Sequence, residues 1–272
     1  MQRWVSLLDV FIWGFVFCFF LYFSEKSGGD VIQTILASLG VVVVMTVIGV
    51  CIEVVIDVFQ NIKGLGTFLG FLTNGPEMVV LLVGIIANDP LFGVSTPLGS
   101  SVINPLMLIL AALATGMLIK LLKAKSVYGM LCVLFTAFIA LVFYLTPVEF
   151  YPLWLIVATI GTVVFFFLRP KELKNEDNFS DIPRWVVVPA IIGLIVAGYY
   201  LDPVVEFAGE VSGAPKNTVG FLVLAALSSW PEFKSCVVLF KKKMILAASN
   251  NIFVSNITNI WLATAGVLFY LF

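Results

Sequence analysis

The segment Thr73-Asn74-Gly75-Pro76-Glu77 lies within a long apolar stretch, and the related segment Ser228-Ser229-Trp230-Pro231-Glu232 lies within another. When the sequence is shifted by 155 residues, the whole of 70–105 aligns with 225–260 without a gap. Each copy therefore places a small hydroxyl residue, a proline and a glutamate inside an apolar segment.

The next apolar segment of each copy also carries matched polar residues. Gly99-Ser100-Ser101-Val102-Ile103-Asn104 aligns with Val254-Ser255-Asn256-Ile257-Thr258-Asn259. Each copy thus adds a serine and an asparagine, separated by about one helical turn. Packing alone does not readily explain a repeat whose matched positions are the polar ones, so we interpret these residues as parts of a site.

The composition indicates a membrane protein. Of the 272 residues, 61% are hydrophobic and only 11% are charged. Runs of about 20 apolar residues suffice to cross a bilayer, and the sequence contains about nine of them. We therefore expect an all-α polytopic membrane protein with about nine transmembrane helices. The net charge of −1 argues against a nucleic-acid partner, and the absence of histidine excludes imidazole metal sites. Membrane lipids and cations are the expected partners, and no cofactor is expected.

The apolar runs divide the chain into four parts. The expected spans are 4–23, 31–60, 65–88, 93–122, 126–146, 151–168, 185–211, 216–240 and 244–272. Residues 1–30 hold an extra N-terminal transmembrane helix, 31–168 a first repeat of five helices, 169–184 a hydrophilic linker and 185–272 a second repeat of three helices.

The distribution of positive charge supports this count. With these spans, twelve Lys and Arg residues fall on the side of the N-terminus and only two on the other side. Because positively charged loops stay in the cytoplasm, we expect a multi-pass protein of the cell membrane with a cytoplasmic N-terminus and linker and an external C-terminus. An odd number of spans separates the two copies, so their topology is inverted. Many transporters place their substrate site at the midplane between inverted repeats, where kinked helices meet.

The chemistry of the repeated residues favours a cation site. A carboxylate inside the bilayer costs about 3 kcal/mol on insertion scales, so Glu77 and Glu232 at matched positions imply a compensating cation. Pro76 and Pro231 each remove a backbone donor and free a carbonyl, which is tolerated at membrane depth only where the backbone lines protein or a cavity. All candidate ligands are oxygens, a set that suits Ca²⁺, which takes about six to eight of them. Beside the two glutamates, the candidate side chains are Thr73, Ser228, Ser100, Asn104, Ser255 and Asn259.

These paired motifs resemble the two α-repeats of the cation/Ca²⁺ exchanger superfamily, the sodium/calcium exchangers. Leu72–Glu77 with Gly99–Asn104, and Leu227–Glu232 with Val254–Asn259, carry the resemblance. It implies a transporter, not an enzyme, that exchanges Ca²⁺ for Na⁺ or H⁺ by alternating access, with Glu77 and Glu232 as the central carboxylates. It also implies that the spans before each copy slide to gate the site.

Departures from the family pattern lead to two further expectations. Asn259 occupies a position that is often Asp, which leaves two carboxylates in the site. Since two negative charges balance one Ca²⁺, two Na⁺ or two H⁺, we expect an electroneutral or weakly coupled exchanger. The family pattern would also continue with two spans beyond Phe272, so a homodimer or a partner subunit in place of those helices is a second expectation.

Other polar residues of the spans have secondary expected roles. Asn74 and Ser229 follow the first hydroxyl of each copy and join the secondary set, with the two prolines. Two acidic pairs near the ends of the gating spans are interpreted as interfacial or access-path groups: Glu53 with Asp57, and Glu206 with Glu210.

Lys234 has no place in the repeated pattern. It lies two residues after Glu232, on a different face of a helix. We expect it to pair with an acidic residue of a neighbouring span, Glu53 or Asp57. The alternative is that its ammonium group replaces a transported cation.

Three alternatives to Ca²⁺/Na⁺ exchange follow from the sequence. The first is an H⁺-coupled Ca²⁺ or cation antiporter, because glutamate can carry protons. The second is a degenerate, non-transporting relative that acts as a membrane scaffold or regulatory subunit. The third, an intramembrane enzyme, lacks any nucleophile–base arrangement in the sequence.

Overall fold

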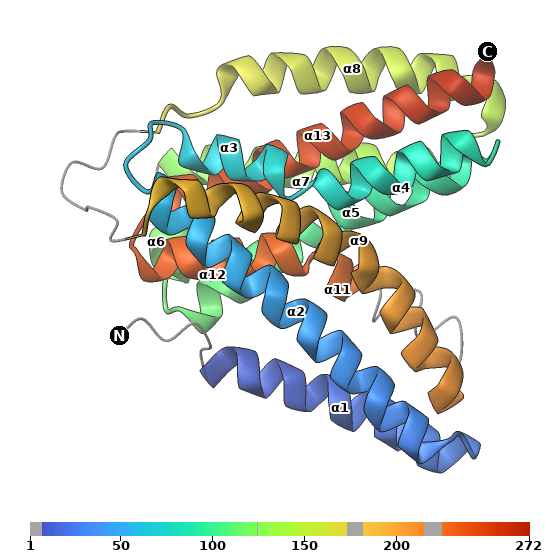
Figure 1. Cartoon of the computed structure of the whole chain (residues 1–272). Helices are drawn as coiled ribbons and strands as arrows, with labels where there is room; N and C mark the ends of the chain where they lie inside the picture. Colours follow the sequence, from blue (N-terminus) through green and yellow to red (C-terminus); the bar gives the residue numbers. More distant parts are fainter. Residues whose placement is uncertain (1–6, 124, 173–181, 215–224) are drawn as a thin grey trace.

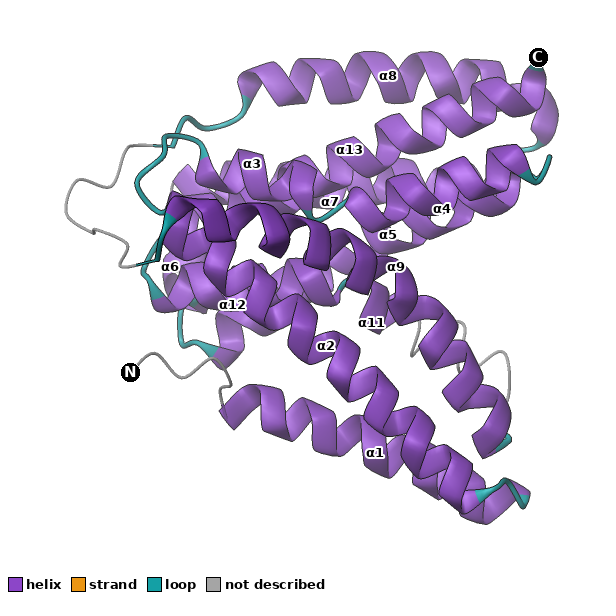
Figure 2. Cartoon of the chain, viewed as in Figure 1, coloured by secondary structure: helices purple, strands orange, loops and turns teal. Residues whose placement is uncertain are grey.

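The chain folds as a bundle of helices. The computed structural model describes residues 7–123, 125–172, 182–214 and 225–272. It is 86% helical, and the described residues form no strand. Figure 2 shows the helices joined by short loops. The expected all-α fold is confirmed.

The helices follow one another along the chain with few interruptions. In order, they are α1 (Leu7–Ser27), α2 (Val31–Phe59), α3 (Leu65–Leu72), α4 (Gly75–Ile86), α5 (Pro90–Ala114), α6 (Leu118–Leu121), α7 (Lys125–Leu145), η1 (Val148–Phe150), α8 (Tyr151–Leu168), η2 (Arg184–Val186), α9 (Val187–Ser212), α11 (Ala225–Ser228), α12 (Trp230–Lys241) and α13 (Ile245–Leu271).

Eight helical stretches among the described residues are long and apolar enough to cross a membrane. This count confirms a polytopic membrane protein. The expected ninth span, 216–240, falls partly on 215–224, which lies outside the described residues. The described remainder of that span forms α11 and α12, neither of which has the length of a spanning helix.

Two helices are broken at equivalent places. α3 ends at Leu72 and α4 begins at Gly75, while α11 ends at Ser228 and α12 begins at Trp230. Pro76 and Pro231 lie in the first turn of the second helix in each case. A proline fits there because the first N–H groups of a helix have no partner within it. Each proline therefore restarts a helix in the middle of an apolar segment.

Backbone geometry follows the 155-residue register of the repeat. α4 and α12 both contain 12 residues. Asn74 (φ −86°, ψ 7°) and Ser229 (φ −83°, ψ 11°), which precede them, have nearly the same backbone angles. Asn88 (φ 58°) and Lys243 (φ 61°), which follow them, are equivalent residues with positive φ. Two copies with such different side chains thus adopt one local conformation.

The two broken helices run in opposite directions. In Figure 1, α3 and α4 run from left to right, whereas α11 and α12 run from right to left. This arrangement agrees with the inverted topology that the span count predicts. α2 and α9, the helices that precede the two copies, pack against each other and run in opposite directions (Figure 1).

Burial distinguishes central from peripheral helices. α13 carries the second Ser–Asn pair and is the most enclosed of the spanning helices, with 67% of its most apolar window buried against 22% for the window of η1 and α8. On α8, Phe167 and Leu168 are 76% and 62% exposed. In a membrane such a face meets lipid, so α13 belongs to the core of the bundle and α8 to its edge.

Candidate cation site

The two glutamates of the repeat are buried and make the same contact in both copies. Glu77 is 3% exposed and Glu232 is fully buried. Ser100 Oγ donates a hydrogen bond to Glu77 Oε1 at 3.4 Å, and Ser255 Oγ donates one to Glu232 Oε1 at 3.1 Å. The restarted helices α4 and α12 thus hold each carboxyl against the serine of the helix that follows.

The carboxyl groups of Glu77 and Glu232 also interact electrostatically with each other. Their carboxyl groups lie close enough for their charges to interact. Two carboxylates in a medium of low dielectric repel strongly, and each is costly to keep in the bilayer. A bound cation lowers both costs, so this arrangement suits positively charged cargo.

Polar side chains join the two copies between the glutamates. Asn74 Oδ1 accepts a hydrogen bond from Ser255 Oγ at 3.0 Å, and Asn74 Nδ2 donates to the Ser255 carbonyl at 2.8 Å. Asn104 Nδ2 donates to Ser255 Oγ at 3.2 Å. A hydroxyl carries one proton, so Ser255 can donate either to Glu232 or to Asn74 at a given moment. The carboxyl of one copy is therefore linked to an amide of the other.

Asn256 connects the two copies a second time. Its Oδ1 accepts from Asn104 Nδ2 at 2.9 Å, and its Nδ2 donates to the Ser101 carbonyl at 3.1 Å. Ser101 is the residue that the repeat aligns with Asn256, so the two central helices α5 and α13 meet at equivalent positions. Asn256 Nδ2 also lies 3.1 Å from Thr136 Oγ1 of α7. This contact anchors the site to the surrounding bundle.

Several oxygen atoms of the expected residues are buried without a hydrogen-bond partner. They are Thr73 Oγ1, Glu77 Oε2, Asn104 Oδ1, Ser229 Oγ, Glu232 Oε2 and Asn259 Oδ1. A buried polar atom without a partner costs about 1–3 kcal/mol. Such oxygens fit the demands of a hard cation. Within the described ranges, no three Asp, Glu, Cys or His side chains form a metal-holding group.

A small cavity lies beside the two helix breaks. Its volume is about 10 Å³, enough for about one water molecule. Its lining residues come from α4, α5, α9, α11 and α12: Pro76, Glu77, Val80, Thr96, Gly198, Leu201, Asp202, Ser228 and Pro231. The cavity brings together four expected residues (Glu77, Ser228 and the two prolines) with Asp202 and Thr96, which were not expected.

Gly198 lets α9 approach the first proline. A Cβ atom at this position would overlap Pro76 Cγ. We expect Gly198→Ala to force the helices apart and to reduce the free energy of unfolding by about 1–3 kcal/mol, as overpacking does. The thermal unfolding temperature of the purified protein in detergent measures this loss.

Gly161→Ala of α8 is the matched control. A Cβ there meets only Ile139 Cδ1, at 3.9 Å. Alanine also favours a helix over glycine by up to about 1 kcal/mol, so this variant should be at least as stable as the parent protein. Equal unfolding temperatures for the two variants would contradict the close approach of α9 to Pro76.

Comparison with known protein families gives a match that includes the second copy of the repeat. Residues 184–271 match the sodium/calcium exchanger protein family. The second copy of the repeat is therefore similar to the sodium/calcium exchangers. The matched segment contains Glu232, Ser255 and Asn259. Comparisons with curated proteins and with solved structures give no match.

Lys234 forms ion pairs with two acidic residues. Its Nζ lies 2.8 Å from Asp9 Oδ2 of α1 and 3.1 Å from Glu53 Oε1 of α2. The Lys234 side chain is only 2% exposed. The expected pairing with Glu53 is confirmed, and Asp9 is an additional partner. This ammonium group connects α12 with α1 and α2.

The two acidic pairs of the gating helices have different surroundings. Asp57 forms an ion pair with Lys242 at 2.7 Å, so Asp57 binds the lysine that follows α12 and Glu53 binds Lys234 within it. Glu206 and Glu210 of α9 are exposed. The symmetry that the sequence suggests for these pairs is therefore not kept in their contacts.

The start of the linker is docked onto the bundle. Glu172 is 7% exposed and accepts hydrogen bonds from the backbone N–H groups of Gly66 and Thr67 at 2.8 and 3.1 Å. Asn250 Nδ2 of α13 donates to the same carboxylate at 3.0 Å. Negative charge is favourable at a helix N-terminus, which explains why Glu172 binds the start of α3. Residues 173–181 lie outside the described part of the linker.

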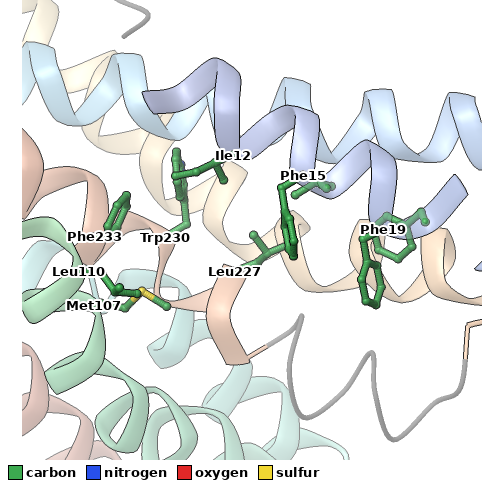
Figure 3. Close-up of a pocket in the computed structure, with 10 residues that line it drawn as sticks. Ile12, Phe15, Phe19, Met107, Leu110, Leu227, Trp230 and Phe233 are labelled. Atoms are coloured by element: carbon green, nitrogen blue, oxygen red, sulfur yellow. The ribbon is translucent and has the colours of Figure 1, made fainter. Parts of the chain in front are cut away.

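The N-terminal helix packs against both copies through apolar side chains. Figure 3 shows a pocket of about 320 Å³ between α1, α5 and the α11–α12 segment. Its labelled lining residues are Ile12, Phe15, Phe19, Met107, Leu110, Leu227, Trp230 and Phe233. All of these side chains are predominantly apolar, so this larger pocket offers no set of cation ligands.

Asp9 and Asp202 are acidic residues that the repeat did not reveal. Each is an acid inside an apolar span, which by itself suggests a functional or paired residue. Neither has an acidic counterpart in the other copy, and the alignment of the two copies therefore passes over both.

Proposed function

We propose that this protein is a secondary active antiporter that exchanges Ca²⁺ for Na⁺ by alternating access. The observation that carries the proposal is the pair of equivalent serine–glutamate contacts in two inverted segments. A site built this way presents the same carboxyl chemistry to both sides of the membrane, which is what alternating access to one cation requires.

The roles of the residues follow from their chemistry. Glu77 and Glu232 carry the negative charge that compensates the cation. Thr73, Asn104 and Asn259 have buried oxygen atoms without hydrogen-bond partners, and these complete the coordination of Ca²⁺. Ser100 and Ser255 orient the two carboxyls and lie in reach of the same cation. Na⁺ competes for the same oxygens, since it is also a hard cation.

In this proposal α2 and α9 are the gating helices, and their close packing supports that role. α2 and α9 pack against each other in opposite directions, and a small residue allows close contact: a Cβ on Gly193 would lie 3.0 Å from Cys51 Sγ. Close packing over small residues is common where membrane helices approach each other. Sliding of this helix pair would open the site alternately to the cytoplasm, on the side of the linker, and to the exterior.

Transport assays test the proposal. The full-length protein is reconstituted into liposomes loaded with Na⁺, and uptake of radiolabelled Ca²⁺ is measured after dilution into Na⁺-free choline medium. We expect an outward Na⁺ gradient to drive uptake above that of liposomes with choline on both sides. An imposed pH gradient that drives uptake in place of Na⁺ would indicate H⁺ coupling. Absence of uptake under every gradient would favour the non-transporting scaffold.

A further inference from the structure

All three ion pairs among the described residues join the α12 segment to the two helices at the start of the chain. Lys234 of α12 pairs with Asp9 of α1 and with Glu53 of α2. Lys242, which follows α12, pairs with Asp57 of α2. We call these five residues the charged seam. In Figure 1 the start of α1 and the ends of α2 and α12 lie on the side where α8 ends and α9 begins. This is the linker side, which is cytoplasmic in the proposed topology.

The equivalent contact of the first copy has a different chemistry. The 155-residue register places small or apolar residues at the equivalent positions: Val79 for Lys234, Ala87 for Lys242, Ala208 for Glu53 and Ser212 for Asp57. α4 and α9 instead meet by close packing, since a Cβ on Gly75 would lie 2.8 Å from Ile195 Cγ1. Each gating helix thus contacts one copy, α2 through charges and α9 through apolar groups.

The interior part of the seam holds two acids and only one lysine. The side chains of Lys234, Asp9 and Glu53 are 2%, 4% and 16% exposed. The lysine also lies against the backbone of α2, because a Cβ on Gly49 would be 3.3 Å from its Cε. Charges buried in this way have lost most of their hydration, and ion pairing restores only part of that free energy. Access of water therefore favours these groups.

This chemistry determines which of the two contacts separates more easily. When α2 moves away from α12, the charged groups of the seam become hydrated, which offsets part of the cost of separation. When α9 moves away from α4, apolar surface meets water with no such gain. The contact between α2 and α12 therefore opens to water at the lower cost.

We propose that the charged seam is the line along which the protein opens to water on the linker side, and that Lys234 is the positioning residue that holds it closed in this conformation. α1, which belongs to neither copy, takes part in this gate through Asp9. The inference rests on the proposed function only in taking α2 as a gating helix. A seam without charge holds α2 against α12 more tightly, whereas a seam with unbalanced charge drives them apart.

The modification rate of an introduced cysteine measures this opening without relying on transport. Val238 lies on the same face of α12, one helical turn after Lys234 and one before Lys242, and is 8% exposed. The full-length Val238→Cys protein in detergent is treated with a water-soluble maleimide, and each modified cysteine is identified by mass spectrometry of its peptide.

Two changes of charge are expected to have opposite effects. In the Val238→Cys background, Lys234→Met leaves Asp9 and Glu53 without their cation, so the modification rate should rise at least about tenfold as their repulsion favours the hydrated state. Adding Asp9→Asn and Glu53→Gln removes the buried charges, so the rate should fall at least about threefold below that of Val238→Cys alone. A loss of packing alone would accelerate the modification in both variants.

Two controls separate opening of the seam from general loosening. Cys132 of α7 is 3% exposed, and its modification rate should stay within about twofold in every variant. Lys123→Met removes an exposed lysine and should leave the Val238→Cys rate unchanged. If Lys234→Met does not yield monodisperse protein, the triple charge variant decides alone.

An unchanged or faster Val238→Cys rate in the triple charge variant, or an equal acceleration at Cys132, would overturn the inference. A protein that transports no Ca²⁺ but shows the two opposite effects would refute the proposed function and leave the seam standing. Unchanged modification rates in a protein that takes up Ca²⁺ in response to Na⁺ would refute the seam and leave the proposed function standing.

Discussion

Glu77→Gln and Glu232→Gln are each expected to reduce the initial rate of Na⁺-driven Ca²⁺ uptake at least about 100-fold. Each variant removes one of the two charges that compensate the cation, while glutamine keeps the size of the side chain and its contact to Ser100 or Ser255. Uptake into proteoliposomes with matched amounts of inserted protein measures the effect.

Equal effects in the two variants are an essential part of this prediction. The two glutamates are equivalent in the repeat and make equivalent contacts, so neither should be dispensable. Glu149→Gln, which changes an exposed acid by the same chemistry, should transport at the parental rate. A rate within about twofold of the parent for either buried variant would rule out that glutamate as a direct ligand.

Replacing Lys234 by methionine should reduce the free energy of unfolding by about 3–5 kcal/mol, the usual loss when one partner of a buried ion pair is removed. The variant leaves Asp9 and Glu53 without their cation in the interior of the bundle. Thermal unfolding in detergent and the yield of monodisperse protein measure the loss. Lys241→Met, which removes an exposed lysine of the same helix, should change stability by less than about 0.5 kcal/mol.

A compensating variant distinguishes charge from packing. Combining Lys234→Met with Asp9→Asn and Glu53→Gln neutralises the whole cluster, and such replacements are often tolerated or stabilising. The triple variant should therefore regain most of the lost stability. A triple variant that is no more stable than Lys234→Met would show that the lysine acts through its packing and not through its charge.

The repeat in the sequence is sufficient to predict the symmetric part of the site. Because the matched residues are polar and lie at fixed spacing, the sequence alone places Glu77 with Ser100 and Glu232 with Ser255 in equivalent sets. Pro76 and Pro231 lie at the helix breaks, but proline alone does not predict a break, because Pro97, Pro105 and Pro203 lie inside continuous helices. The repeat in the sequence therefore accounts for the two equivalent sets of site residues.

The asymmetric contacts are not predictable in the same way. The partner of Lys234 depends on how three helices meet in space, so the sequence indicates an acidic neighbour and Glu53 as one candidate, but not Asp9. The repeat does not point to Asp202, because the 155-residue register places the apolar Val47 at the equivalent position of the first copy. Glu172 resembles part of a hydrophilic tether, and only the position of the α3 N-terminus shows why it is buried. Long-range packing decides each of these cases.

Equilibrium binding of Ca²⁺ to the purified protein tests the central claim most directly. If Glu77 and Glu232 together hold one cation, the parental protein binds one Ca²⁺ per chain, Na⁺ displaces it, and Glu77→Gln and Glu232→Gln each abolish binding. Retention of parental Ca²⁺ affinity by either variant would contradict a shared site between the two inverted copies.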